Sequence, residues 1–166
     1  MVAIYKYCPL CRTSLEKVKL DNQNRNRCPS CGWINYRNPV PAVACVVKKG
    51  TKYLLVKRAV EPQKGKWSLP AGFMELHEKP EEAVLRELKE ETGLKGEVEE
   101  LIGVYAQPSK SYGTVLTLGY SVKNFTGKLS GGDDVDEAKF FKIDSLRDIP
   151  FSSHRKMLID SGFREI

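Results

Sequence analysis

Two pairs of cysteines near the start of the chain place the tightest constraint on its fold. Cys8 and Cys11 flank Pro-Leu, Cys28 and Cys31 flank Pro-Ser, and sixteen residues separate the two pairs. A C-x2-C turn directs both of its sulfurs at one point, so two such turns complete a tetrahedral Zn²⁺ site. Because sulfur fills all four positions, the metal is expected to be structural. Two disulfides are an alternative that conflicts with a cytosolic protein, and iron held by the same sulfurs stays open.

The segment that holds these cysteines is also basic. Up to Pro39 the chain has seven Lys or Arg against two acidic residues, a net charge of +5, whereas the whole chain has +6. This segment resembles a zinc ribbon, with residues 21–27 as the tip of a hairpin between the cysteine pairs. We therefore predict a zinc ribbon over residues 1–38 and a second domain over residues 39–166. A basic ribbon suits RNA or a partner protein, but a solvated face on a small folding module is the preferred interpretation.

The second domain alternates short apolar segments with two helical patterns. Residues 42–47 and 53–56 flank a polar turn and predict a hairpin, and residues 35–41 predict an extended linker or a first edge strand. Residues 79–92 have helical period, with Pro80 in the first turn and Gly93 at the stop. Further strands are expected around residues 97–106, 114–123 and 138–143, before a last helix over residues 152–161. This order predicts an α+β domain with a mixed sheet.

Composition limits where a chain like this acts. No apolar run approaches the roughly 20 residues that a membrane helix needs, and the first residues do not read as a secretory signal. We expect a soluble, cytoplasmic protein without a membrane partner. Cys45 lies in an apolar segment and is expected to be a small core residue rather than a reactive thiol.

Three carboxylates crowd one turn of the predicted helix. Glu87, Glu90 and Glu91 stand at i, i+3 and i+4 on one helical face, where like charges repel each other. A solvated acidic face screened by nearby lysines is one interpretation. A divalent hard cation is the other, because Mg²⁺ and Mn²⁺ take carboxylate oxygens and keep waters for a phosphate-bearing ligand.

The residues before this turn decide between the two interpretations. Residues 72–94 read GFMELHEKPEEAVLRELKEETGL. They fit the pattern G-x5-E-x7-R-E-U-x-E-E-x-G-U, where U is a bulky aliphatic residue, and so the chain resembles a Nudix hydrolase over residues 39–166. The specified positions are filled by Gly72, Glu78, Arg86, Glu87, Leu88, Glu90, Glu91, Gly93 and Leu94.

That resemblance implies a fold, a reaction and a set of ligands. The fold is the α/β/α Nudix sandwich, and the reaction is hydrolysis of a nucleoside diphosphate linked to another moiety. Glu87, Glu90 and Glu91 are expected to bind Mg²⁺ or Mn²⁺, with the backbone carbonyl of Gly72 as a further ligand. Arg86 is expected to pair with Glu78 and to hold the loop against the helix.

The reaction also needs a group that accepts a proton from water. A metal-bound water loses its proton more readily, and a carboxylate is a suitable acceptor. Glu90 and Glu91 are candidates within the motif. Glu137 is a third, because it ends an acidic run before a strand, where many Nudix enzymes keep an extra glutamate; plain solvated acidity is the other interpretation of that run.

The substrate is less constrained than the reaction. The ribbon and the motif together resemble Nudix proteins that act on ADP-ribose, FAD or NADH. Trp67 and Tyr112 are candidates to stack on a base or nicotinamide ring, and Lys66 is a candidate phosphate contact. Beyond the motif, only Gln107-Pro108 matches the pattern found in NADH pyrophosphatases. Pro108 lies close to, but not at, the position where ADP-ribose pyrophosphatases tend to have a proline. Tyr112 fits the tyrosine that diadenosine polyphosphate hydrolases favour.

Three alternatives follow from the same residues. The chain is an enzyme that removes nucleotide caps from RNA, or a module that senses a nucleotide without hydrolysing it, although an intact motif argues against the latter. A homodimer is also open. His77 is expected in an exposed loop and His154 near the start of the last helix, and neither is assigned a catalytic role.

Overall fold

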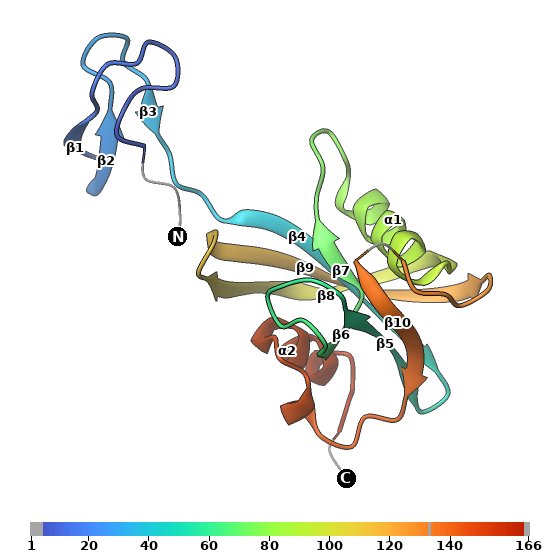
Figure 1. Cartoon of the computed structure of the whole chain (residues 1–166). Helices are drawn as coiled ribbons and strands as arrows, with labels where there is room; N and C mark the ends of the chain where they lie inside the picture. Colours follow the sequence, from blue (N-terminus) through green and yellow to red (C-terminus); the bar gives the residue numbers. More distant parts are fainter. Residues whose placement is uncertain (1–4, 133, 165–166) are drawn as a thin grey trace. The chain divides into compact units, whose positions relative to one another are not determined.

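The computed structural model describes residues 5–132 and 134–164 (Figure 1). The chain divides into two compact units. The first comprises the residues up to Pro39 together with Pro108–Thr114, and the second comprises Val40–Gln107 and the residues from Val115 onward. In the described ranges, no helix is both long enough and apolar enough to cross a membrane.

The first unit contains a three-stranded antiparallel sheet. Its strands, in the order β1-β2-β3, are β1 (Glu16–Leu20), β2 (Gln23–Arg27) and β3 (Ile34–Asn35). The predicted hairpin is present, but its tip was placed wrongly: residues 23–27 form β2, and the turn is only Asp21 and Asn22. Both turn residues have positive φ, 49° and 60°, which Asp and Asn tolerate and which matches the twist of a two-residue hairpin.

The second unit is built on a seven-stranded mixed sheet. The path is β10-β5-β4-β9-β8, with β6 paired to β5 and β7 paired to β4. Strand β4 runs parallel to β9 and antiparallel to β5 and β7. The strands are β4 (Val40–Lys49), β5 (Lys52–Arg58), β6 (Trp67–Ser68), β7 (Ala71–Phe73), β8 (Lys95–Ser109), β9 (Gly113–Thr126) and β10 (Val135–Phe141).

Two helices cover opposite faces of this sheet. Residues of β4 alternate between the faces: Val43 and Cys45 belong to one apolar cluster with Leu88 of α1 (Pro80–Thr92). Ala44 belongs to a second cluster with Met157 of α2 (Ser152–Asp160) and with Leu146, which lies in a 3₁₀ turn at Leu146–Asp148. The α+β class and the α/β/α sandwich are therefore confirmed, and Cys45 is fully buried in the core.

Several predicted boundaries differ from the observed ones. The sequence predicts an extended linker or a first edge strand over residues 35–41. Residues 36–39 belong to no strand, as in a linker, while β4 begins at Val40 and lies inside the sheet, next to β9, rather than at its edge. Strand β10 begins earlier and ends earlier than the predicted range of 138–143, while β8 and β9 are longer than expected. Strands β6 and β7 were missed because two or three residues are too short to show a period of two.

Helix α1 is bounded by local signals. Pro80 opens it, and the backbone N–H of Lys79 donates to Glu82 Oε2 at 3.1 Å. Gly93 ends it in the left-handed conformation at φ 72°, and a side chain there would also collide with the carbonyl of Lys128. Ala83 and Leu88 are fully buried against the sheet. The helix is thus fixed along its length, and the acidic turn near its end has a defined position.

Candidate active site and metal centre

The floor of the candidate site is the backbone of β7 at Gly72. This glycine pairs with Val43 of β4, and the α1 side chain directly above it is Glu87. A Cβ built on Gly72 would lie 2.1 Å from the Glu87 carboxyl carbon. Only glycine therefore lets the Glu87 carboxylate rest against the strand, which gives the glycine of the motif a steric reason.

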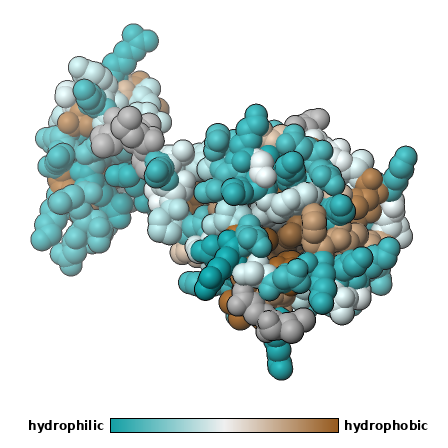
Figure 2. All heavy atoms as spheres, turned by 60° about the horizontal axis from the view of Figure 1, so that its bottom comes forward, coloured by the Kyte–Doolittle hydropathy of each residue, from teal (hydrophilic) through white to brown (hydrophobic). Residues whose placement is uncertain are grey.

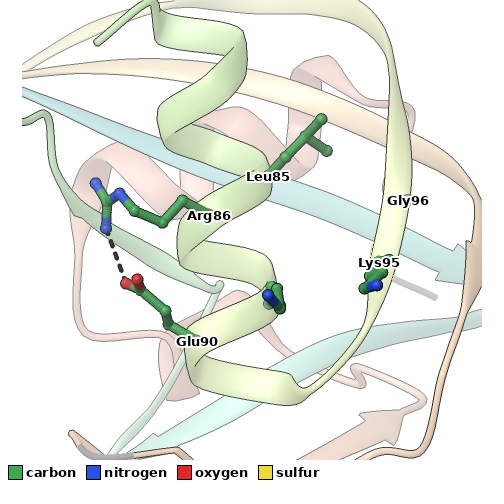
Figure 3. A pocket seen from close by; sticks show the side chains of 6 residues that line it. Leu85, Arg86, Glu90, Lys95 and Gly96 are labelled. Atoms are coloured by element: carbon green, nitrogen blue, oxygen red, sulfur yellow. Dashed lines mark hydrogen bonds and ion pairs between the residues drawn. The ribbon is translucent and has the colours of Figure 1, made fainter. Parts of the chain in front are cut away.

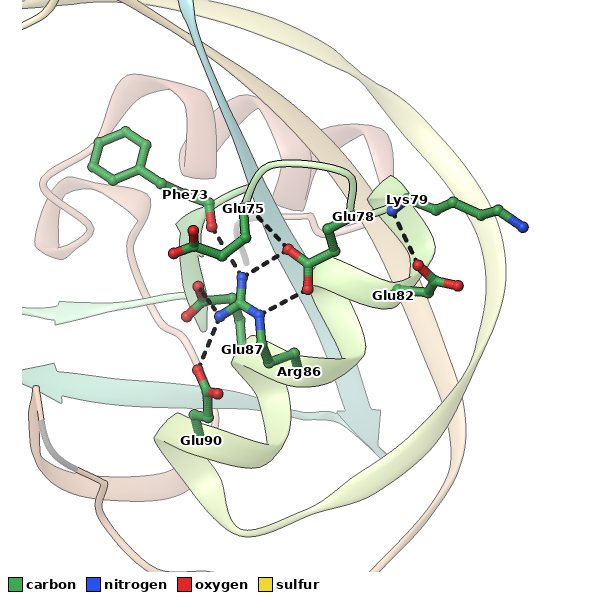
Figure 4. A network of polar contacts seen from close by, with 8 residues as sticks. All are labelled: Phe73, Glu75, Glu78, Lys79, Glu82, Arg86, Glu87 and Glu90. Carbon is green, nitrogen blue, oxygen red and sulfur yellow. Dashed lines mark hydrogen bonds and ion pairs between the residues drawn. The ribbon is translucent and has the colours of Figure 1, made fainter.

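Arg86 joins four parts of the motif through one guanidinium group (Figure 4). Its Nε and Nη2 donate to the two Glu78 oxygens at 2.8 and 3.0 Å, the pairing expected from the sequence. Nη1 donates to Glu87 Oε1 at 2.7 Å and to Glu90 Oε2 at 2.9 Å, and Nη2 also donates to the Phe73 carbonyl. A planar group with five donors suits this arrangement, and a lysine could not reproduce it.

The charges in this network shift one another. Hydrogen bonding to Arg86 holds the pKa of Glu78 below its ordinary value, and Glu78 raises the pKa of Arg86 in return. Burial raises the pKa of Glu87, and the neighbouring Arg86 opposes that rise. Arg86 therefore keeps negative charge concentrated at the junction of the loop and the helix.

Glu91 is the most deeply buried carboxylate of the three. Its side chain reaches β7, where its Oε2 accepts the Ala71 backbone N–H at 2.9 Å. Its pKa is raised to about 8, chiefly by burial; the charges of Glu87 and Asp134 also raise it, while the Ala71 bond and Arg58 lower it. A buried carboxylate among other carboxylates is short of positive charge, which a bound cation would supply.

Glu90 points away from the strand and toward solvent. Its side chain is 58% exposed, and together with Arg86 it borders an open hollow of about 490 Å³ beside α1 (Figure 3). Leu85, Lys89, Lys95 and Gly96 complete the lining of this hollow. One turn of helix thus presents one buried, one half-buried and one exposed carboxylate.

These groups fit a hard divalent cation. All the side-chain donors are carboxylate oxygens, and the closest backbone lies at a glycine, where a side chain would fill the available space. Mg²⁺ and Mn²⁺ prefer such oxygen ligands and retain waters. The roles of Glu87, Glu90, Glu91 and the Gly72 carbonyl as ligands stay predictions.

The acidic loop before β10 contributes a residue that sequence reasoning missed. Besides Glu87, the charge of Asp134, which directly precedes β10, raises the pKa of Glu91. Glu137 lies further along β10 beside Lys57 of β5, is half exposed, and is 4.0 Å from Lys139. The sequence signal for Asp134 was the acidic run itself, but nothing in the run identifies which member faces α1. The role of Glu137 as a proton acceptor stays a prediction.

The predicted substrate contacts are divided between the two units. Trp67 packs edge-on against Phe141 at 4.5 Å between ring centroids, and with Lys66 it lines a cavity of about 770 Å³ that also contains Arg147. Tyr112 lies in the turn between β8 and β9, is 47% exposed, and groups with the first unit. The roles of all three stay predictions.

The two histidines agree with the sequence analysis. His77 is exposed in the loop before α1. His154 is buried in α2, and its Nδ1 accepts the Leu69 backbone N–H at 3.3 Å. Burial lowers the pKa of His154 to about 3, with a smaller effect from Arg58, so the ring is neutral. The charge of Arg58 thus lowers the pKa of both His154 and Glu91, which lie on different elements, and no spacing in the sequence reveals this.

The four cysteines of the first unit converge at one point. Their sulfurs all lie within 4.8 Å of one another, and the Cys8–Cys31 and Cys11–Cys28 pairs are 3.5 and 3.4 Å apart. No disulfide joins them. A tetrahedron with metal–sulfur bonds of about 2.3 Å has sulfurs roughly 3.8 Å apart, so the cluster fits a single metal ion.

The two cysteine turns have the same backbone geometry. The Arg12 N–H donates to the Cys8 carbonyl at 2.8 Å, and the Gly32 N–H donates to the Cys28 carbonyl at 3.0 Å. Arg12 and Gly32 both have positive φ, 62° and 77°. Each turn therefore bends back on itself at the residue after its second cysteine.

Comparison with known proteins identifies relatives over most of the chain. The family model described as NUDIX domain matches residues 38–160. An ADP-ribose pyrophosphatase of Methanocaldococcus jannaschii is 42% identical over 126 residues, which cover 75% of this chain and 74% of that protein. An NAD-capped RNA hydrolase NudC of Pseudomonas aeruginosa is 30% identical over 146 residues, or 87% of this chain, but this match covers only half of that longer protein.

The fold also has a close match among solved structures. A crystal structure of a NUDIX hydrolase from Nitrosomonas europaea superposes with a TM-score of 0.74 at 30% identity. The match covers 93% of this chain and 88% of the other.

Proposed function

Since this chain belongs to the Nudix family, whose enzymes hydrolyse pyrophosphate bonds, we propose that its substrate is a nucleoside diphosphate of the ADP-ribose type. FAD and NADH are further members of the same substrate class. The products are a nucleoside monophosphate and a second phosphorylated compound. The observation that carries the proposal is the intact set of Glu87, Glu90 and Glu91 on one turn of α1, in which Arg86 bonds Glu87 and Glu90 and Glu87 lies against Gly72. The 42% identity to an ADP-ribose pyrophosphatase favours ADP-ribose among the candidates.

The proposed cofactor is Mg²⁺ or Mn²⁺, held by Glu87, Glu90 and Glu91 with the Gly72 carbonyl. When bound, such a cation neutralises the diphosphate and lowers the pKa of a water molecule. Arg86 keeps Glu87 and Glu90 oriented and leaves Glu91 to its own bond with Ala71. The bonds to Arg86 and to Ala71 restrict the carboxylate side chains before a cation binds, which lowers the cost of ordering them.

A carboxylate of the chain takes the proton from the attacking water. Glu90 and Glu91 are the candidates on α1, and Glu137 is the candidate on β10. Glu90 is exposed and can pass a proton on to solvent, whereas Glu91 is buried and already shifted toward the protonated form. Replacing each by Gln keeps its size and removes its basicity. Because Glu90 and Glu91 are also proposed metal ligands, the base is identified by the pH profile of kcat at saturating metal rather than by loss of activity alone.

Recognition of the rest of the substrate is assigned to Trp67, Tyr112 and Lys66. Trp67 and Lys66 line the cavity of about 770 Å³, which supplies an aromatic surface and a cation in one place. Tyr112 is 47% exposed and is proposed to stack on a ring of the substrate.

The Cys8, Cys11, Cys28 and Cys31 cluster is proposed to bind structural zinc. All four sulfurs are committed to one point, so no position is left for a substrate. A reducing, cytoplasmic location suits this assignment because thiolates remain available there. Metal analysis of the purified chain distinguishes zinc from iron.

A substrate panel tests the proposed function. The full chain is incubated with ADP-ribose, NADH, FAD and a diadenosine polyphosphate, each with Mg²⁺ or Mn²⁺, and the products are separated by chromatography. We expect ADP-ribose to give the highest kcat/KM, with AMP and ribose 5-phosphate in equal amounts. Failure to cleave any of the four compounds with either metal would contradict the proposal.

Removal of an NAD-type cap from RNA is the second candidate function. The matches to NAD-capped RNA hydrolases and the basic first unit favour it. It uses the same bond cleavage, so a comparison of kcat/KM for NADH and for NAD-capped RNA distinguishes the two. A preference for the capped RNA of tenfold or more would establish the second function.

A further inference from the structure

One face of the ribbon sheet carries only amides and lysines. Directly paired residues of an antiparallel sheet share a face, and the register pairs Lys17 with Asn26 and Asn26 with Asn35. The next row on the same face pairs Lys19 with Asn24. We call these five residues the Lys–Asn face.

Carboxylates are absent from this face. The only acidic residues up to Pro39 are Glu16 and Asp21. Glu16 pairs with Arg27 in a row that belongs to the opposite face, and Asp21 lies in the turn. The Lys–Asn face therefore attracts anions without competition from its own acids, whereas the opposite face has a mixed charge.

An aromatic group lies beside the same face. The Asn26 side-chain amide donates to the Tyr5 backbone carbonyl at 3.3 Å, which places that backbone over the Lys–Asn face. The Tyr5 ring packs edge-on against Trp33 at 5.8 Å between centroids and is still 48% exposed. A held but accessible ring next to amides and lysines provides stacking, hydrogen bonding and charge within one small surface.

The unit as a whole favours a polyanion. Its residues up to Pro39 carry a net charge of +5, and four thiolates around a divalent ion would still leave +3. Its visible surface is mainly hydrophilic, with isolated apolar residues (Figure 2, at the left).

We propose that the Lys–Asn face, with the Tyr5 ring beside it, binds single-stranded RNA. The lysines contact phosphates, the Asn side chains offer both a donor and an acceptor to exposed base edges and 2′-hydroxyls, and Tyr5 stacks on an unpaired base. A duplex hides its base faces and so cannot use the ring. This binding is independent of which pyrophosphate the second unit cleaves.

A binding titration with matched variants tests the proposal. The full-length protein is titrated into a fluorescent, unstructured RNA of roughly 12 nucleotides, within the usual footprint of such surfaces. The variant K17Q/K19Q is compared with K52Q/K128Q, which removes two exposed charges from the second unit instead. We expect K17Q/K19Q to lose about tenfold in affinity, and its salt slope to fall by about 1.4, at about 0.7 per lost phosphate contact on a single strand. The control should stay within twofold of the wild type.

Further titrations identify which kind of nucleic acid the Lys–Asn face binds. Duplex RNA should bind at least tenfold more weakly than the single strand, and Tyr5→Leu should weaken single-strand binding by about fivefold or more through lost stacking. DNA of the same sequence should bind more weakly than RNA. Zinc content and ADP-ribose turnover of each variant show that the ribbon and the active site remain intact, so a failure here is distinct from a failure of the proposed function.

Three results would overturn the proposal. The first is K17Q/K19Q binding RNA as tightly as K52Q/K128Q, which would show that the face is not used. The second is equal affinity for duplex and single strand, which would leave only nonspecific attraction between charges. The third is equal affinity for DNA, which would remove the assignment to RNA.

Discussion

The two units of this chain are held together by different means. Among the described residues up to Pro39, only Cys8 and Cys28 are buried, so apolar packing contributes little to the ribbon. The second unit buries two apolar clusters on opposite faces of its sheet, with Val43, Leu54 and Leu88 fully inaccessible. A unit with so little core is therefore expected to depend on the metal proposed for its cysteine cluster, whereas a unit with two apolar layers needs no metal to fold.

The same contrast decides where chemistry is located. In the ribbon, the four cysteine sulfurs converge on one point, so none of them is left for a substrate. In the second unit, the carboxylates of α1 are not needed for folding, because apolar burial on the opposite side of the helix already holds it. The free-energy cost of burying the carboxyl groups of Glu87 and Glu91 is then offset by apolar packing in the rest of the unit.

Removing the ribbon's metal should give the largest difference between the units. Cys28→Ser deletes a buried ligand, and structural zinc contributes apparent binding energies of about 10–16 kcal/mol to modules of this size. We expect amide resonances of the ribbon strands to collapse to unfolded positions, while amides of β4 keep their protection from hydrogen exchange. Loss of protection in both units together would show that the second unit depends on the first.

Glu91→Gln should remove activity without unfolding the second unit. Gln can still accept the Ala71 N–H but cannot bind a cation or a proton as a carboxylate does, so kcat should fall by at least about a hundredfold. Because an uncharged group replaces a buried carboxylate, the melting temperature should be unchanged or higher.

The control is Glu97→Gln, which changes the same charge at an exposed glutamate bonded to Asn124 and should leave kcat unchanged. A large drop in melting temperature for Glu91→Gln would indicate a structural role.

Equivalent core truncations should have unequal costs in the two units. Leu88 is fully buried, and Leu88→Ala should cost about 2–5 kcal/mol in the free energy of unfolding of the second unit. Leu20 is only half-buried on β1, and Leu20→Ala should cost less than about 1.5 kcal/mol in the ribbon. Denaturant titrations followed by unit-specific probes measure both. Equal costs would mean that the ribbon relies on apolar packing after all.

Gly72→Ala tests whether the floor of the site is built for Glu87. The new Cβ would overlap the Glu87 carboxylate, so that carboxylate must move off the strand. We expect the Mg²⁺ concentration for half-maximal activity to rise by about 10- to 100-fold, as for the loss of other groups that orient metal ligands. An unchanged Mg²⁺ dependence would show that the position of Glu87 over Gly72 is not needed.

The sequence predicted what is local and missed what is assembled from distant segments. The α1 boundaries, the shared face of Glu87, Glu90 and Glu91, and the convergence of the cysteines all follow from short spacings. The burial of Glu91 under Ala71 and the influence of Asp134 and Arg58 on it come from β7, β10 and β5, which no spacing brings together. The hairpin tip was overestimated because polar residues 23–27 look like a loop, although a small sheet with two exposed faces accepts them as a strand.

The smallest predicted effect compares the two cysteine turns of the ribbon. Both need a positive φ after the second cysteine, and Gly32 provides it freely whereas Arg12 adopts it at a cost. Nothing lies within 4 Å of a Cβ added at Gly32, so Gly32→Ala adds only backbone strain of about 1 kcal/mol. Because ribbon folding and zinc binding are coupled, zinc affinity measured against a chelator should fall by about fivefold for Gly32→Ala.

Arg12→Gly removes the strain but also makes the unfolded chain more flexible, so it should leave zinc affinity unchanged or slightly higher. A loss of zinc affinity in Arg12→Gly as large as that in Gly32→Ala would show that the two turns are not equivalent and that the Arg12 side chain itself supports the site.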